Sequence, residues 1–468
     1  MITFLRINSP FLVFAIILLL LLLKLPFISG ELPTLLPEME WIVLGQKMGE
    51  GSTLYTEIWT SVAPLSALVY WLVNLFMGQE QFAYELTAYL FIVFQAVYLS
   101  IIANRREFYL ERNYVVGAIY VLLANLSFDL GKLSPALMGT TFLIIAYNSF
   151  AKQISNRDGV RDDVFEVGLF VGVATLFHLP FVAFLPWIIL AMLLFTGASF
   201  RQILLIALGF ILPIFIMGIY FYFVSDFEAF RYNVLESSIR FTQLSFGKLL
   251  EVFYTFTIPF LISLVGYFLL ITNNRYNGGQ SRMHQIALLG ILFGVVAYIL
   301  SPYKIPMQLY GTLPFIAIFI AGFFLHMKGT YLPEIAFIIL LLFTLFIQYQ
   351  GVKPLIGKGF NHLEEVRLSE QVPPDIVKGK KMLIIGERID EYKYGKQVTA
   401  YLNWNLSKRD LAEPNDYESV VNIFDNFRKE PPEVIIDKKG VIPTIFKRIP
   451  RLAKDYKPSE IEGIYLRK

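Results

Sequence analysis

Long apolar segments, repeated along residues 10 to 350, constrain the fold of this 468-residue chain more than any other feature of the sequence. A segment of about 20 apolar residues is long enough to cross a hydrocarbon core of about 30 Å. Hydrophobic residues make up 56% of the chain and charged residues 16%, whereas soluble domains have about 45–50% and about 25%. The pattern predicts a polytopic α-helical membrane protein with about eleven transmembrane helices, at residues 10 to 29, 82 to 103, 114 to 127, 134 to 150, 164 to 178, 180 to 198, 202 to 224, 250 to 272, 285 to 301, 308 to 326 and 333 to 350.

The first apolar segment, residues 10 to 29, has two interpretations. It is N-terminal and follows Arg6, as the apolar region of a signal peptide would. Its apolar run is longer than the roughly 7 to 15 residues of such a region, and no small-residue cleavage site follows it cleanly. We therefore expect an uncleaved signal anchor.

Lys and Arg residues in the connections between spans indicate the orientation. With the N-terminus in the cytoplasm, eleven of them lie in inner connections and six in outer ones, provided that residues 63 to 77 do not cross. At about 15 residues, that segment fits a re-entrant or interfacial helix better than a span. The charge pattern predicts an inner N-terminus and an outer C-terminus.

The composition changes at about Gly351, where charged residues become dense and apolar residues shorten into bursts. Residues 381 to 386 (KMLIIG) and 432 to 437 (PEVIID) are typical of buried strands, and Tyr417 to Phe427 is typical of a helix. No GxGxxG follows the first strand, so nothing indicates a dinucleotide site. Residues 351 to 468 are predicted to form a small α/β domain on the outer face, next to a transmembrane domain of residues 1 to 350.

Several classes of site and partner are excluded by composition. Cysteine is absent, which rules out disulfides and thiolate metal sites. The net charge of +3 gives no sign of a polyanionic ligand, and we expect no nucleic-acid partner.

Carboxylates are concentrated between Leu35 and Gly78, directly after the first apolar segment. They are Glu38, Glu40, Glu50 and Glu57. Glu38 and Glu40 follow Pro37, which favours a helix start with both acids in its first turn, where the helix dipole stabilises them. The plain interpretation is a solvated pair of helix acids, and the alternative is a site at the membrane surface.

The order of features resembles the large family of polytopic GT-C fold glycosyltransferases, which use polyprenyl-phosphate-linked sugars. The resemblance lies in the acidic PEME segment (37 to 40), an LY-x-x-x-W element (54 to 59), a helix from Pro64 to Gly78, a basic inner loop, and YKIPMQLYGTLPFIAIFIAG (303 to 322). The C-terminal PEVIID segment is similar to the soluble domain of many bacterial members. The resemblance implies a GT-C-like fold with juxtamembrane helices in the outer loop 30 to 81, in a bacterial cytoplasmic membrane, with the C-terminal domain in the periplasm.

The resemblance also implies roles for particular acids. Glu38 matches the family's general base, with Glu40 beside it, and a carboxylate suits an acceptor hydroxyl that must lose a proton. Ala136 stands where many members have a second acid, and Asp129 is the candidate substitute. Metal use in the fold varies, which leaves a divalent cation, Mg²⁺ or Mn²⁺, open.

Other side chains are candidates for binding the donor or the acceptor. A lipid-linked phosphate needs cations at the outer surface, for which the sequence offers Arg231, Arg240 and Lys304, although solvated residues at span ends look the same. Around the acceptor we expect Glu57, Tyr55, His178 and Glu85. A satisfied interfacial histidine is the plain interpretation of His178, and Glu85 is expected to face the same cavity as Glu38.

Three functions remain open. The first is transfer of a sugar from a polyprenyl-phosphate-linked donor to a lipid, glycan or protein acceptor on the outer face of the membrane. The second is a catalytically silent scaffold subunit of a cell-envelope or secretion complex, with other membrane proteins as partners. A transporter fits least well, since we find no inverted repeats or charged residues in the middle of spans.

Overall fold

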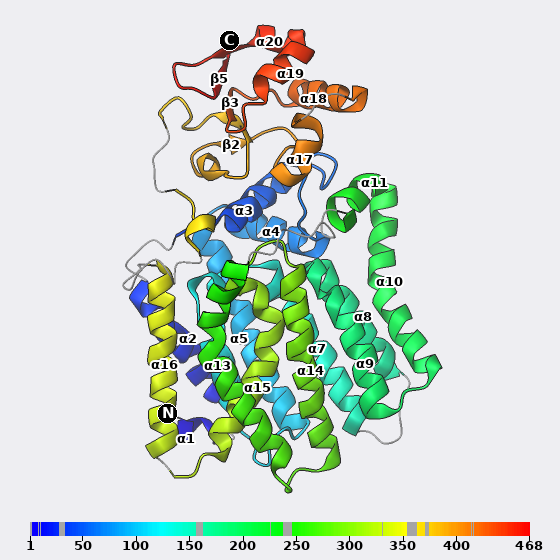
Figure 1. Ribbon diagram of the computed structural model, residues 1–468, viewed down its shortest axis with the longest axis vertical. Helices are drawn as coiled ribbons and strands as arrows, with labels where there is room; N and C mark the ends of the chain where they lie inside the picture. Colours follow the sequence, from blue (N-terminus) through cyan, green and yellow to red (C-terminus); the bar gives the residue numbers. More distant parts are fainter. Residues whose placement is uncertain are drawn as a thin grey trace.

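The computed structural model describes residues 2–7, 9, 11–27, 33–155, 162–224, 226–236, 246–352, 363–369, 374–412, 414 and 416–468. Most of the long helices lie side by side along the long axis of the molecule (Figure 1). Together with the short helices α1 (Ile2–Leu5) and α11 (Phe227–Phe230), this part contains α2 (Leu12–Lys24), α5 (Gln81–Arg105), α6 (Val115–Leu123), α7 (Pro135–Ser155), α8 (Asp162–Phe177), α9 (Phe184–Thr196), α10 (Phe200–Val224), α13 (Phe246–Thr272), α14 (Gly278–Leu300), α15 (Leu313–His326) and α16 (Tyr331–Val352).

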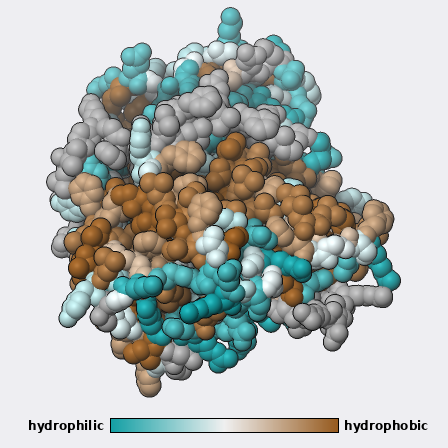
Figure 2. Space-filling model, turned by 60° about the horizontal axis from the view of Figure 1, so that its bottom comes forward, coloured by the Kyte–Doolittle hydropathy of each residue, from teal (hydrophilic) through white to brown (hydrophobic). Residues whose placement is uncertain are grey.

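The predicted polytopic helical architecture is confirmed. Within the described residues, seven helical stretches are long and apolar enough to cross a membrane, and three shorter apolar helices accompany them. The expected span at 114 to 127 contains α6, which has nine residues, all of them buried. A helix enclosed by protein need not match the thickness of the lipid. Figure 2 shows apolar side chains forming a belt across the bundle, between hydrophilic regions on either side.

Glycines bring α8 and α10 into close contact. A Cβ atom on Gly168 would lie 2.1 Å from the Ile206 carbonyl oxygen, and one on Gly172 would lie 2.4 Å from that of Phe210. Small residues spaced four apart allow two membrane helices to approach backbone to backbone. The α8–α10 pair is therefore held by main-chain packing.

Two helices of the predicted outer loop, residues 30 to 81, lie across one end of the bundle, below the C-terminal domain (Figure 1). They are α3 (Leu36–Gly49) and α4 (Pro64–Met77). The position of α4 agrees with the prediction that residues 63 to 77 do not cross. The helices meet where the Trp41 and Tyr70 rings stack at 5.6 Å, and the absence of a side chain on Gly45 makes room for the Tyr70 backbone.

The C-terminal domain is a five-stranded sheet with helices, as predicted. Its strands are β1 (Lys381–Ile385), β2 (Lys396–Gln397), β3 (Val434–Asp437), β4 (Tyr456–Pro458) and β5 (Ile464–Arg467), in the order β2-β1-β3-β5-β4. The first three are parallel, and β5 is antiparallel to β3 and β4. One face packs on α17 (Trp404–Leu411), α18 (Tyr417–Lys429), α19 (Ile442–Arg448) and α20 (Pro450–Asp455). The other face shares an apolar cluster with the bundle.

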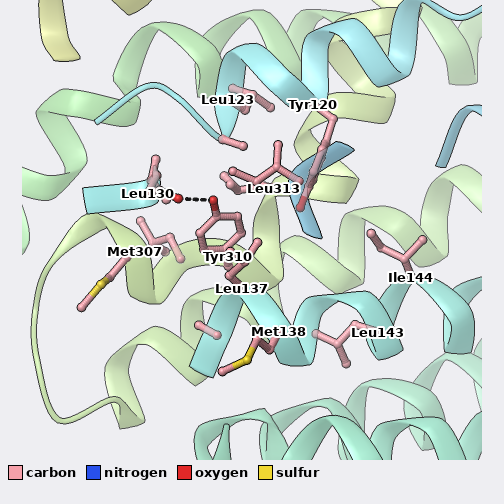
Figure 3. Close-up of a cluster of buried hydrophobic side chains, with 14 of the residues drawn as sticks. Tyr120, Leu123, Leu130, Leu137, Met138, Leu143, Ile144, Met307, Tyr310 and Leu313 are labelled. Atoms are coloured by element: carbon pink, nitrogen blue, oxygen red, sulfur yellow. Dashed lines mark hydrogen bonds between the residues drawn. The ribbon is translucent and has the colours of Figure 1, made fainter. Parts of the chain in front are cut away.

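A buried cluster joins the two short 3₁₀ turns that lie beneath the outer loop, η2 (Phe128–Gly131) and η5 (Pro306–Thr312). Figure 3 shows Tyr310 directed at Leu130, with Leu137, Met307 and Leu313 around it. The Tyr310 hydroxyl donates a hydrogen bond to the Leu130 carbonyl oxygen. This contact fixes the loop between α14 and α15 against the loop between α6 and α7.

Candidate functional site

Glu38 lies in a buried ionic cluster. Its Oε1 atom is 3.0 Å from Lys132 Nζ, and the same ammonium group is 2.7 Å from Glu85 Oε1. Glu38 Oε2 also accepts a hydrogen bond of 3.2 Å from the Leu35 backbone N–H. The structure thus brings Glu38 and Glu85 together through a shared lysine, whereas the sequence placed them on a common cavity.

The charges of this cluster compensate one another. Burial raises the pKa of Glu38, and the attraction of Lys132 opposes that rise. Burial acts to lower the pKa of Lys132, yet Glu38 and Glu85 together raise it above its ordinary value. Lys132 lies three residues after Asp129, and no local pattern in the sequence marks it as the partner of Glu38.

A polar cavity of about 640 Å³ lies where the end of the bundle, the outer loop and the C-terminal domain meet. Glu40 and Trp41 of α3 line it, and so does Pro135, beside Ala136. The remaining lining residues are Ser61, Val62, Ala63, Phe177, His178, Leu179, Pro180, Leu300, Pro302, Tyr303, Gln308, Glu387, Asn403, Asn405, Leu406 and Lys408. Among the acids that the sequence proposed as catalytic, Glu40 is the one that borders this cavity.

The Glu40 carboxylate is held by two neutral donors. Its Oε1 atom accepts hydrogen bonds of 3.0 Å from Thr60 Oγ1 and 3.1 Å from Asn403 Nδ2. In the part of the chain that the structure describes, no donor reaches Oε2 and no cation pairs with this carboxylate. Burial raises the pKa of Glu40, while the bonds from Asn403 and Thr60 act to lower it. Glu40 is therefore a carboxylate with an oxygen available to the cavity.

His178 and Tyr303 add neutral groups to the same cavity. His178 Nε2 is 3.2 Å from Ser301 Oγ, and burial lowers the pKa of His178 to about 3. Burial, reinforced by the charges of Glu40 and Glu387, raises the pKa of the Tyr303 phenol. Both side chains are uncharged at neutral pH, so they can form hydrogen bonds with a ligand but cannot neutralise a phosphate.

Asp129 lies outside this cavity. It is fully buried, and its Oδ2 atom accepts a hydrogen bond of 2.8 Å from the Met307 backbone N–H. Burial raises the pKa of Asp129 to about 6, against hydrogen bonds from the Ser127 side chain and from backbone N–H groups. In this position the carboxyl group ties η2 to η5, close to the Tyr310 contact of Figure 3.

Of the cations that the sequence proposed for phosphate binding, the two that the structure describes, Lys304 and Arg231, do not line the cavity. Lys304 Nζ donates to the carbonyl oxygens of Ile299, at 2.9 Å, and of Ser301, at the end of α14. Arg231 pairs with Glu228 at 2.7 Å, and Arg240 lies outside the described residues. Lys408 of α17 is the cationic side chain among the cavity residues described above. Nothing in the sequence around Lys408 distinguished it from the other lysines of the soluble domain.

Glu57 and Tyr55 brace the outer loop and do not line the cavity. Glu57 accepts a hydrogen bond of 2.7 Å from the Thr53 backbone N–H and pairs with Lys429 of α18. Tyr55 is fully buried, with a φ of 68°, and its hydroxyl donates to the Val62 carbonyl oxygen at 2.7 Å. Glu57 thus connects the loop to α18, and the Tyr55 bond closes the loop on itself.

The described residues contain no group of three or more His, Asp and Glu side chains arranged to hold a metal ion. Glu40 and Glu387 are the two carboxylates among the described cavity-lining residues. The divalent cation left open by the sequence stays a prediction.

Comparisons with known proteins add a likeness in structure. No family model and no curated protein matches the chain. The structure is similar to a crystal structure of ArnT from Cupriavidus metallidurans bound to undecaprenyl phosphate, with 12% identity and a TM-score of 0.49 over 68% of this chain and 61% of ArnT. It is also similar to the archaeal oligosaccharyltransferase AglB from Archaeoglobus fulgidus in complex with an inhibitory peptide and a dolichol-phosphate, with 11% identity and a TM-score of 0.49 over 91% of this chain and 70% of AglB. This chain thus matches less than two thirds of the length of ArnT.

Proposed function

We propose that this chain is a GT-C type membrane glycosyltransferase in which Glu40 accepts the proton of the acceptor hydroxyl. The observation that carries the proposal is the Glu40 carboxylate, which is buried, lacks a cationic partner among the described residues and borders a polar cavity at the end of the bundle. A general base must be close to the proton that it takes and must be ionised at the working pH. Glu38 meets the first condition less well, because it is not among the residues that line the cavity and its carboxylate is paired with Lys132.

The proposed reaction is a displacement at the anomeric carbon of a polyprenyl-phosphate-linked sugar. The acceptor oxygen forms a bond to this carbon while the bond to the phosphate oxygen breaks. The proton of the acceptor hydroxyl passes to Glu40, and the electron pair leaves with the polyprenyl phosphate. Charge that develops on the phosphate is stabilised by cations and hydrogen-bond donors, for which Lys408 and Tyr303 are the cavity residues that we propose.

Gln308 is a further candidate for binding a sugar in this cavity. The residue is 3% exposed, and its Oε1 atom has no hydrogen-bond partner among the described residues. A buried polar atom without a partner costs about 1–3 kcal/mol. This oxygen is enclosed by protein in the structure, so a sugar hydroxyl in the cavity can donate to it only after the Gln308 side chain turns toward the cavity.

The surroundings of the cavity suit a donor that is anchored in the membrane. Residues from helix ends of the bundle and from the C-terminal domain line the cavity, and that domain lies beyond one end of the bundle (Figure 1). We propose that the polyprenyl chain lies along the bundle on the outer side of a bacterial cytoplasmic membrane. The sugar and the acceptor, whether a lipid, a glycan or a protein, are left open.

The second candidate function is a scaffold subunit without catalytic activity. Two observations favour it. Glu38, the carboxylate that matches the family's base, forms an ion pair with Lys132. Ala136 stands at the position where many family members have the second acid. Under this alternative the cavity binds no reacting sugar, and Glu40 is dispensable.

Complementation of a deletion strain separates the two functions. Glycans, lipids and proteins of the cell envelope would be compared by mass spectrometry in cells that carry the wild-type chain, Glu40→Gln or Glu50→Gln. Glu50 is a solvent-exposed acid at the end of the same helix, so E50Q is the matched control and should restore the modification that deletion removes. Loss of a general base typically costs about 10²–10⁴-fold in rate, and we expect E40Q to restore little or none. Full restoration by E40Q would favour the scaffold.

A further inference from the structure

The C-terminal domain is joined to the outer loop through backbone hydrogen bonds that run in both directions. The Trp59 N–H donates to the Ala400 carbonyl oxygen at 2.7 Å, and the Asn403 N–H donates to the Trp59 carbonyl oxygen at 3.1 Å. The Trp59 ring also packs edge-on against Tyr401, with the ring centres 5.2 Å apart. Residues 400 to 403 therefore have a fixed position over the loop that carries Thr60.

Asn403 uses both ends of its side-chain amide. Its Oδ1 atom accepts a hydrogen bond of 3.0 Å from the Asn405 backbone N–H and so caps the N-terminus of α17. Its Nδ2 atom donates to Glu40 Oε1 at 3.1 Å. The cap fixes the orientation of the amide, and the amide in turn fixes the carboxylate.

We infer that Asn403, supplied by the C-terminal domain, is a positioning residue for Glu40. Asn403 and Thr60 together bind Oε1, which leaves Oε2 as the oxygen that takes the acceptor proton. The inference rests on the proposed function for its catalytic meaning, but the state of the carboxylate is measurable without any substrate. Docking of the soluble domain then completes the reactive site, since the outer loop alone provides one of the two donors.

Removal of the amide donor should make Glu40 a weaker acid. A hydrogen bond to a carboxylate favours the charged form, so its loss raises the pKa of the carboxyl group. The titratable and charged groups facing Glu40 from the elements packed around it are Tyr70 of α4, His178, Tyr303, Glu387 and Lys408. None of them changes in the variants below, so a shift reports the deleted donor.

The test is an infrared titration of the purified full-length chain in detergent micelles, with the proton as the only ligand. The carboxyl band that disappears in Glu40→Gln identifies Glu40, and its midpoint is followed in Asn403→Ser. Serine is a good N-cap but is too short to reach Glu40, and it adds no titratable group. We expect the midpoint to rise by about one to two pH units, given the strength of a hydrogen bond to a charged group.

Two further variants complete the design. Asn405→Ser makes the same chemical change two residues away, at a cavity side chain that accepts a hydrogen bond from Lys408 and does not touch Glu40. It should not raise the midpoint, because any movement of the freed Lys408 ammonium group toward Glu40 favours the charged carboxylate. Thr60→Val removes the other donor to Glu40 Oε1 and should raise the Glu40 midpoint. A midpoint in N403S equal to that of the wild type, with the protein folded, overturns the inference. If N403S does not fold, T60V takes its place. An unshifted Glu40 midpoint in T60V then overturns the inference that Asn403 and Thr60 together hold Oε1.

Transfer activity separates this inference from the proposed function. If the inference and the proposed function are both correct, the acidic limb of the pH–rate profile of N403S moves to higher pH together with the infrared midpoint. If E40Q retains transfer activity while the midpoint of Glu40 still moves in N403S, the assignment of Glu40 as the base is wrong and the positioning contact stands. If E40Q is inactive and N403S keeps both the wild-type midpoint and profile, the positioning role is wrong and the base assignment stands.

Discussion

Replacement of Lys132 by methionine tests the buried ionic cluster beneath the outer loop. The Lys132 side chain is 1% exposed, and its ammonium group lies 3.0 Å from Glu38 and 2.7 Å from Glu85. At an effective dielectric constant of about 20, each contact corresponds to about 6 kcal/mol of attraction, most of which offsets the cost of burying the charges. Without the ammonium group Glu38 stays buried without its ion-pair partner, while Glu85 keeps the attraction of Lys24, so we expect the free energy of unfolding to fall by about 3–5 kcal/mol.

The assay is thermal unfolding of the purified full-length chain in detergent, followed by tryptophan fluorescence. Lys396→Met is the matched control, because the ion pair of Lys396 with Glu50 is 3.4 Å long and solvent exposed; such pairs contribute little to stability. Addition of Glu38→Gln to K132M removes the uncompensated charge and should recover part of the loss. A K132M variant that unfolds at the wild-type temperature, with K396M unchanged, would refute the reasoning.

Two further predictions concern acid stability and helix packing. Burial raises the pKa of Asp129 from 3.8 to about 6, so the folded chain holds a proton that the unfolded chain releases, and stability falls as the pH rises from about 4 to 6. Asp129→Asn should remove about 3 kcal/mol of this dependence, measured by unfolding at pH 4 and pH 7. Gly45→Ala would place a Cβ atom 2.6 Å from the Tyr70 carbonyl oxygen and should cost about 1–3 kcal/mol. Gly278→Ala, with open space around it, should cost nothing measurable in the same thermal assay, and equal stability of the two variants would contradict the packing argument.

Local patterns in the sequence predicted the architecture well. The apolar runs predicted the helical bundle, the length of residues 63 to 77 predicted a helix that does not cross, and KMLIIG and PEVIID contain strands β1 and β3. Each of these features depends on hydrophobic periodicity within one segment. They could therefore be derived without knowledge of the rest of the chain.

The site could be predicted only in part, because its geometry depends on contacts between distant segments. Glu38 and Glu40 are two residues apart, which on an α-helix turns their side chains by about 200° from one another. One therefore faces Lys132 inside the protein and the other faces the cavity. The sequence identified the acidic segment but could not show which carboxylate would meet a lysine from a loop almost one hundred residues later.

Asp129 illustrates the same limit. The sequence placed it close to the missing acid at Ala136, yet its partner is the backbone of Met307, in a different part of the chain. A short polar side chain in a loop satisfies buried backbone groups as readily as it binds a ligand. Only the contact between η2 and η5 distinguishes the two roles.

The position of the C-terminal domain has a consequence for dissection of the protein. Composition changes at about residue 351, but Met382, Ile384, Val434 and Ile436 of its sheet belong to the same continuous apolar cluster as the transmembrane helices. A cut at the compositional boundary would expose this apolar surface to water, and would remove Asn403 from Glu40 and Lys429 from Glu57. Under the proposed function the minimal active unit therefore extends well beyond the membrane, and a library of variants designed to alter the proposed substrate choice should include residues 387 and 403 to 408 along with the spans.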